Sequence, residues 1–206
     1  MDAIATSKPY QRKSVPNGVL AMILLLVTEA MLYGGLISAY IVNRAGATVW
    51  PPPDQPRLPV EVTGVNTLIL LSSAVVLFLF NKRINKVGKL DAKSTNILLI
   101  TILLGATFLT IQGTEWARLI GYGLTTHSSI YGAFFYTLIG AHGLHVFAGL
   151  CILFYLYFSI RKARLNGSVG QASTFEIAKN KISTCILYWY FVVAIWPILY
   201  RLVYFN

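Results

Sequence analysis

YGAFFYTLIGAHGLHVFAGLCILFYLYFSI, residues 131–160, is a predominantly apolar run that carries two histidines near its centre, His142 and His145. A helix needs about 20 apolar residues to span a bilayer, so this run predicts a transmembrane helix. An ionisable side chain inside such a span is by default a candidate functional residue. The run therefore indicates both a membrane fold and the position of a possible site.

The composition of the whole chain agrees with a membrane fold. Hydrophobic residues make up 56% of the 206 residues and charged residues only 12%, compared with about 25% charged residues in soluble domains. The apolar runs span about residues 18–42, 64–80, 96–119, 131–160 and 182–203. We therefore expect an all-α membrane protein, with residues 1–206 forming a single transmembrane domain built as a bundle of five helices.

The positive charges alternate between the two sides that these five helices define. One side holds Lys8, Arg12, Lys13, Lys82, Arg83, Lys86, Lys89, Lys93, Arg161, Lys162, Arg164, Lys179 and Lys181, and the other holds Arg44, Arg57, Arg118 and Arg201. The positive-inside rule then predicts the N-terminus inside and the C-terminus outside. The net charge of +10 does not indicate nucleic acid as a partner, because the cations lie in short segments between apolar runs.

Two segments between the runs are predicted to be non-helical. The segment 49–59, VWPPPDQPRLP, is too rich in proline to form a helix. The segment 161–181 contains NGSVGQAS and is predicted to be a linker on the membrane surface. The cysteines Cys151 and Cys185 lie inside apolar runs without CxxC spacing, so neither a disulfide framework nor a zinc site is indicated.

Glu29 is the carboxylate closest to the middle of the membrane. It lies about 16 Å along the axis of the first predicted helix, a depth similar to that of His142 and His145. The two histidines are at i, i+3 and share one side of their helix, so either could be the partner of Glu29. Three roles stay open for these residues: a polar tie between helices, a proton relay or proton buffer, and a contact with lipid or with a partner chain.

The histidines do not form a pattern for metal binding. His142 and His145 project from one helix and cannot occupy opposite axial positions of one haem, and the third histidine, His127, lies in an outer loop. Copper or di-metal sites need ligands from several helices, including further His, Cys or Met. We expect no metal centre and no catalytic residue in this chain.

A second set of polar residues lies toward the predicted outer side. Gln112 and Glu115 are at i, i+3 near the end of the third run, and Asn66 lies at a similar depth in the second. We expect an outer polar cluster in which Asn66 hydrogen-bonds across to Gln112 and Glu115. Trp116, next to Glu115, is typical of the lipid headgroup level.

Six stretches spread over all five runs carry a family resemblance. They are TEAMLYGGLISAYIV (28–42), WPPP (50–53), VNTLILLSSAV (65–75), QGTEW (112–116), FFYTLIGAHGLHVFAGL (134–150) and YWYFVVAIWPILYRLVYF (188–205). With them the chain resembles subunit III of the haem-copper oxidases in its short, five-helix bacterial form. In the last helix the family usually has Trp-His-Phe-Val-Asp, whereas this sequence has Tyr190 and Val193 in place of the His and the Asp.

The resemblance implies an accessory subunit of a proton-translocating terminal oxidase of aerobic respiration, in the bacterial cytoplasmic (inner) membrane. It implies that haem and copper belong to the catalytic subunit I, that other oxidase subunits and phospholipids are partners, and that this chain stabilises the catalytic subunit. Glu29, His142 and His145 would be structural or proton-linked residues. The alternatives are a subunit III-like protein of a quinol oxidase or nitric oxide reductase, and a stand-alone proton channel.

Overall fold

The computed structural model describes residues 16–205 except 54, 89 and 166–171. The helices are α1 (Asn17–Gly46), α2 (Val60–Val87), α3 (Ala92–Gly121), α4 (Ile130–Leu165) and α5 (Ala172–Tyr204), and no strand occurs in these described ranges. Five helices are long and apolar enough to cross a membrane. The predicted all-α membrane fold with five helices is confirmed, and the orientation of the termini stays a prediction.

Every helix is longer than the apolar run that predicted it. Polar and basic residues extend each helix past its apolar run. They can do so at the membrane boundary because long lysine and arginine side chains reach the polar headgroup layer from a helical backbone. The predicted linker at 161–181 is therefore wrong in most of its length: α4 continues to Leu165 and α5 begins at Ala172. Only residues 166–171 separate the two helices, and they lie outside the described part of the chain.

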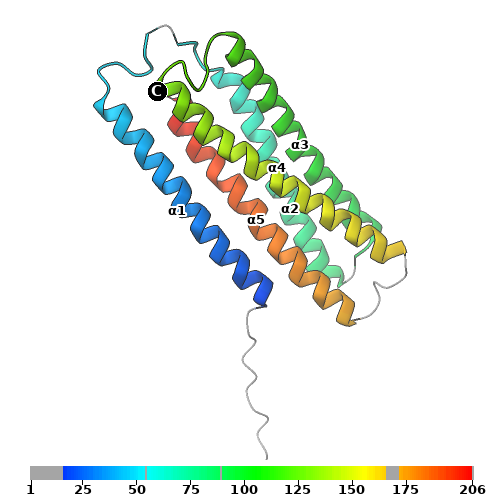
Figure 1. Ribbon diagram of the computed structural model, residues 1–206. Helices are drawn as coiled ribbons and strands as arrows, with labels where there is room; N and C mark the ends of the chain where they lie inside the picture. The colour runs from blue at the N-terminus through cyan, green and yellow to red at the C-terminus, as the bar shows by residue number, and fades with distance from the viewer. Residues whose placement is uncertain (1–15, 54, 89, 166–171, 206) are drawn as a thin grey trace, which may run out of the picture.

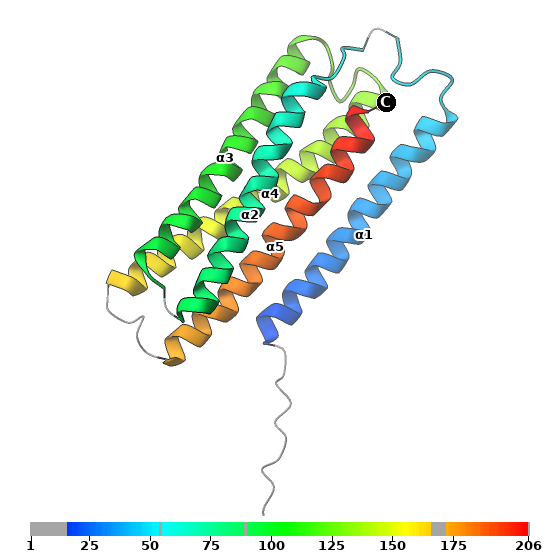
Figure 2. The same cartoon turned by 180° about the vertical axis from the view of Figure 1, so that it is seen from behind.

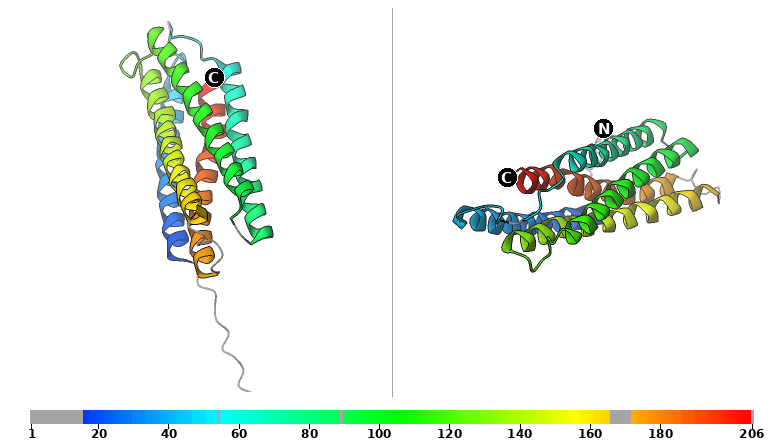
Figure 3. Two further views of the ribbon diagram at one scale, coloured as in Figure 1. Left: turned by 90° about the vertical axis from the view of Figure 1, so that its right-hand side faces the viewer. Right: turned by 90° about the horizontal axis from the view of Figure 1, so that it is seen from above.

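The helices run alternately up and down the bundle (Figures 1 and 2). α2 and α3 pack together along a hairpin, and α5 contacts α1, α2 and α4. α1 lies at one edge, where the contacts found within the described ranges are with α4 and α5 only (Figure 3). We call the end at which α1 ends and α4 begins the C-terminal end of the bundle, because Tyr204 closes α5 there.

A tight turn joins α2 to α3. Gly88 ends α2 in the left-handed conformation, with φ 67°, and its N–H donates to the carbonyl of Ile84. Glycine adopts this conformation without steric cost. Asp91 begins α3 by accepting a 2.8 Å hydrogen bond from the backbone N–H of Ser94, and its carboxylate also pairs with the guanidinium of Arg83. The ion pair joins the end of α2 to the start of α3.

Replacing Asp91 with alanine is expected to lower the free energy of unfolding by about 1 kcal/mol, the usual cost of losing a helix cap. Asp91→Asn is expected to retain most of this stability, because asparagine caps a helix equally well. The Arg83 guanidinium, and after it the Ser94 hydroxyl, hold the pKa of the Asp91 carboxyl well below its usual range. The resulting stabilisation is complete above the unfolded-state pKa of about 3.9 and is lost as the pH falls from there through the folded-state value.

Thermal unfolding of the detergent-solubilised protein, followed by tryptophan fluorescence from about pH 7 to about pH 3, measures this dependence. The wild type is expected to lose more stability over the acidic part of the range than Asp91→Asn. Identical pH profiles for the two proteins would contradict the contribution of the ion pair.

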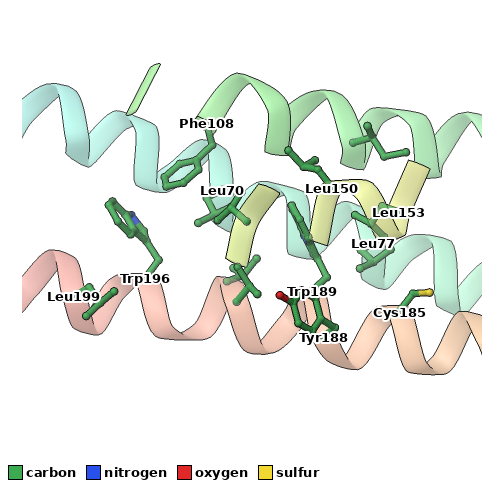
Figure 4. Packing of buried hydrophobic residues seen from close by; sticks show 14 of the residues in the cluster. Leu70, Leu77, Phe108, Leu150, Leu153, Cys185, Tyr188, Trp189, Trp196 and Leu199 are labelled. Atoms are coloured by element: carbon green, nitrogen blue, oxygen red, sulfur yellow. The ribbon is translucent and has the colours of Figure 1, made fainter. Parts of the chain in front are cut away.

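The centre of the bundle is built around two tryptophans of α5, Trp189 and Trp196, both with 0% exposure. Trp189 lies against Gly105 of α3 and Gly149 of α4, where any side chain would collide with its ring. Figure 4 shows both indole rings pointing from α5 toward the other helices. Each indole N–H is satisfied by a hydroxyl of α2: Trp189 donates to Ser73 over 3.1 Å, and Trp196 donates to Thr67 over 2.8 Å. These contacts fix the register of α5 against α2, α3 and α4.

Candidate functional site

An acid–histidine pair joins α1 to α4. Oε2 of Glu29 lies 2.8 Å from Nε2 of His145. The other ring nitrogen of His145, Nδ1, lies 2.6 Å from the carbonyl oxygen of Ala141 and 3.2 Å from the hydroxyl of Tyr33. The predicted contact between Glu29 and one of the two histidines is therefore present, and His145 is the partner.

The hydrogen bonds of His145 define where protons must be. A carbonyl oxygen only accepts, so Nδ1 must carry a hydrogen and donate it to Ala141. The short contact between Nε2 and Glu29 then requires a second proton between these two atoms, because a lone pair facing a carboxylate would repel it. The pair is either a protonated carboxyl beside neutral histidine or a carboxylate beside imidazolium. In both forms Glu29 and His145 share one proton.

The shared proton lies at the edge of the bundle and not in its centre. The side chain of Glu29 is 22% exposed and that of His145 is 14% exposed. Tyr33 covers the pair from α1, with its ring centroid 5.4 Å from that of His145. Tyr188 of α5 donates to the backbone carbonyl of His145 over 3.3 Å. The pair thus lies where α1, α4 and α5 meet.

His142 points in a different direction from His145. Its ring is stacked on Trp196 at 4.8 Å between centroids and lies edge-on to Phe108 at 6.1 Å. It is 1% exposed. Either histidine was expected to be able to reach Glu29. Positions i and i+3, however, are separated by a rotation of about 60° around the helix axis. That rotation turns His142 toward α3 and α5 and leaves His145 facing α1.

The three residues of the second predicted cluster, Asn66, Gln112 and Glu115, each bind a group outside that cluster. Asn66 donates to the backbone carbonyl of Phe108 over 3.1 Å, and Gln112 donates to the Tyr204 hydroxyl over 3.1 Å. Glu115 pairs with Arg118 at 2.9 Å. Asn66 reaches across to α3 as expected, but to a backbone group and not to Gln112 or Glu115. Tyr204, the partner of Gln112, was not foreseen.

Comparison with known proteins identifies the family. The sequence matches the family model described as cytochrome c oxidase subunit III over residues 2–206. This chain belongs to the cytochrome c oxidase subunit III family. As a subunit III it is a multi-pass membrane protein that belongs to a complex with other oxidase subunits.

Several curated relatives carry the name cytochrome c oxidase subunit 3. The protein of Thermostichus vulcanus is 34% identical over 186 residues, covering 90% of this chain and 86% of its own length. That of Synechocystis is 33% identical, with 89% and 73% covered. A probable cytochrome c oxidase subunit 3 of Mycobacterium leprae is 31% identical, with 92% and 89% covered. The resemblance noted from the sequence is confirmed.

In the last helix, this subunit III has Tyr190 and Val193 where the family pattern has His and Asp. Val193 is 3% exposed and belongs to the apolar core, so the position of the family's Asp is packed as a hydrophobic residue here. The hydroxyl of Tyr190 is buried and has no hydrogen-bond partner within the ranges that the structure describes. In the same ranges no group of three or more His, Cys, Asp or Glu side chains is arranged to hold a metal ion.

Two residues of the candidate site were missed in the sequence, Tyr33 and Tyr188. Tyrosine in a transmembrane run is ordinarily assigned to the headgroup level, so neither was considered. A signal for Tyr33 was available: it follows Glu29 by four residues and therefore lies on the same side of α1. Nothing in the sequence distinguishes Tyr188 from the neighbouring aromatic residues of α5.

Proposed function

We propose that this subunit III is the non-catalytic accessory subunit of a proton-translocating oxidase, bound beside a catalytic subunit I that carries haem and copper. Support comes from the histidines. The chain contains three; His145 is held by Glu29, and His142 is stacked between aromatic rings. Neither is arranged as one of several convergent ligands. The chain stabilises its catalytic partner and takes no part in oxygen chemistry itself.

Purification of the tagged chain from its host membrane tests this assignment. We expect a haem-containing subunit to co-purify, visible by its absorption spectrum, and the haem type to distinguish a cytochrome c oxidase from a quinol oxidase or a nitric oxide reductase. A chain that purifies free of haem and conducts protons in liposomes would overturn the assignment in favour of a stand-alone channel.

The single observation that carries a more specific role is the 2.8 Å contact between Oε2 of Glu29 and Nε2 of His145. This pair lies within membrane-spanning helices, about midway along α1, where a titratable pair is a candidate for proton handling. We assign it two functions: it ties α1 to α4, and it exchanges its proton during turnover. His142 is assigned a structural role among the aromatic rings. The cluster of Asn66, Gln112 and Glu115 is assigned to packing at the C-terminal end of the bundle.

The chain resides in the bacterial cytoplasmic membrane, as a bacterial oxidase subunit III would. The distribution of lysine and arginine predicts that its N-terminus lies inside. The basic ends of α2 and α4, which carry Lys82, Lys86, Lys162 and Arg164, attract anionic phospholipid headgroups.

Glu29→Gln separates the two functions of the pair. Glutamine has the same shape and can donate an amide hydrogen to Nε2 of His145, but its amide does not release a proton at physiological pH. We expect Glu29→Gln to assemble normally and to change either the turnover rate of the complex or the decay of that rate during continuous turnover. Oxygen consumption under steady-state conditions, together with the subunit content before and after, measures both quantities.

The matched control is Glu29→Leu, which removes the hydrogen bond as well as the proton. If Glu29→Gln equals the wild type in turnover and lifetime while Glu29→Leu does not, the pair is only a tie between helices. If both variants behave as the wild type, neither function is required.

A further inference from the structure

Buried polar atoms without partners gather in the half of the bundle nearer its C-terminal end. Three of the side chains that carry such atoms are Asn66 of α2, Gln112 of α3 and His142 of α4, each no more than 2% exposed. The atoms are Asn66 Oδ1, Gln112 Oε1 and both ring nitrogens of His142, none of which has a hydrogen-bond partner among the described residues, and the same holds for the indole nitrogen of Trp116 in α3. Buried polar groups in native proteins are nearly always hydrogen-bonded, to protein or to ordered water, so a cluster of unpaired ones needs an explanation.

The register of the helices places these atoms in one column. The hydrogen bond from Asn66 to the carbonyl of Phe108 aligns α2 with α3. These helices are antiparallel, so Thr63, three residues before Asn66, lies at the level of Gln112, four residues after Phe108. The ring of Phe108 also touches that of His142. His142 and Asn66 thus form one layer, and Thr63 and Gln112 form a second layer about 5.4 Å closer to the C-terminal end.

Two neighbouring side-chain donors are already engaged. The indole N–H of Trp196, whose ring covers one face of His142, is donated to Thr67. The amide nitrogen of Gln112 donates to Tyr204. Exchanging the oxygen and nitrogen of the Gln112 amide would leave its NH₂ group unpaired in place of its oxygen. The same exchange in Asn66 would set its oxygen against the carbonyl oxygen of Phe108.

Tyr204 connects the column to the surface. Besides accepting from Gln112, Tyr204 lines a cavity of about 320 Å³ at the C-terminal end of the bundle, together with Gln55 and Arg57 of the loop between α1 and α2. The Gln55 side-chain oxygen is also buried and lacks a partner within the described ranges. Polar atoms therefore continue from this cavity, past Tyr204, to the two layers inside.

We infer that ordered water molecules occupy an internal site between α2, α3, α4 and α5, bound by His142 and Asn66 in one layer and by Gln112, at the level of Thr63, in the other. A buried water typically makes about three hydrogen bonds, and these side chains provide both donors and acceptors. His142 needs a donor on one side of its ring and an acceptor on the other, and water can be either. The ligand of this site is water, and the site is separate from the Glu29–His145 pair.

Hydroxyl-radical footprinting tests the site in the intact, purified oxidase. Brief X-ray pulses in ¹⁸O-labelled water oxidise side chains next to bound water, and mass spectrometry locates the label. Trp196 and Trp189 form a matched pair, since both belong to α5 and both are 0% exposed. Trp196 touches His142, whereas Trp189 packs against Gly105 and Gly149 with its N–H bound to Ser73. We expect Trp196 to be labelled several-fold faster than Trp189.

Equal and slow labelling of the two tryptophans would overturn the inference. This comparison needs no variant, so a folding defect cannot obscure it. Gln112→Leu is expected to reduce the labelling of Trp196, because it removes a ligand of the water, whereas Ser73→Ala, which alters only the surroundings of Trp189, is expected to leave it unchanged. A density map of the complex supports the site if water lies within about 3.2 Å of a His142 ring nitrogen, and contradicts it if that space holds no density.

Discussion

Gly105→Ala is expected to destabilise the protein by about 2 kcal/mol, the middle of the range for overpacking a well-packed core. A Cβ at this position would lie 2.6 Å from Cη2 and 2.8 Å from Cζ2 of Trp189. The indole cannot retreat easily, because Gly149 of α4 also lies against it: a Cβ at Gly149 would come within 2.9 Å of Cε3. Its N–H is also held by Ser73. The measurement is thermal unfolding of the detergent-solubilised protein, followed by tryptophan fluorescence.

Gly113→Ala is the matched control in the same helix. A Cβ at Gly113 would meet no atom of the described residues within 4 Å, and alanine favours a helix over glycine by up to about 1 kcal/mol. We expect Gly113→Ala to be neutral or stabilising. Adding Trp189→Phe to Gly105→Ala should recover part of the loss, because the smaller ring vacates the position of the clash. Equal effects of the two alanine substitutions would show that Trp189 does not fill the space beside Gly105.

His145→Leu is expected to produce the second large effect, a loss of about 2 kcal/mol. Removing one partner of a buried pair leaves the other without compensation, which costs about 3 kcal/mol or more when the remaining group stays charged. The expected loss is smaller here because the pair is only partly buried, with Glu29 22% and His145 14% exposed. Leucine preserves the apolar volume, so the loss reports on the polar contact. Unfolding of the solubilised protein measures the loss, and the amount of subunit III retained by the complex provides a second readout.

The double variant Glu29→Leu/His145→Leu distinguishes a polar interaction between α1 and α4 from simple packing of the two side chains. Replacing both members of a buried pair with apolar residues is often neutral, so we expect the double variant to be more stable than His145→Leu alone. The difference from additivity measures the coupling between the two side chains. Additive losses would contradict the direct hydrogen bond between Glu29 and His145.

The five helices were predictable because their signal is local. Each apolar run is long enough to span a membrane, and neither flanking charges nor short loops disguise it. Glu29 and the two histidines were predictable as a group because rise per residue converts sequence position into depth. Sequence position did not predict which histidine faces Glu29, because depth carries no information about the rotation of α4 around its axis. That rotation is set by contacts such as the stacking of His142 on Trp196.

The polar partners of α2 and α3 show a second limit of the sequence. Asn66 and Gln112 could be assigned to similar depths, but whether they meet one another or a backbone group depends on helix register to within one residue. That register is fixed by Trp189 and Trp196, which insert from α5, far away in the chain. The extension of α4 and α5 beyond their apolar runs was also missed, because basic residues end an apolar run without ending a helix.

The position of α1 at the edge of the bundle has a consequence for biogenesis. α1 leaves the ribosome first, yet within the described ranges its helix contacts are with α4 and α5, which are synthesised last. Its bond to His145 joins residues separated by 116 positions in the chain. α1 therefore enters the membrane without its final neighbours and closes onto the bundle only after α5 has been inserted.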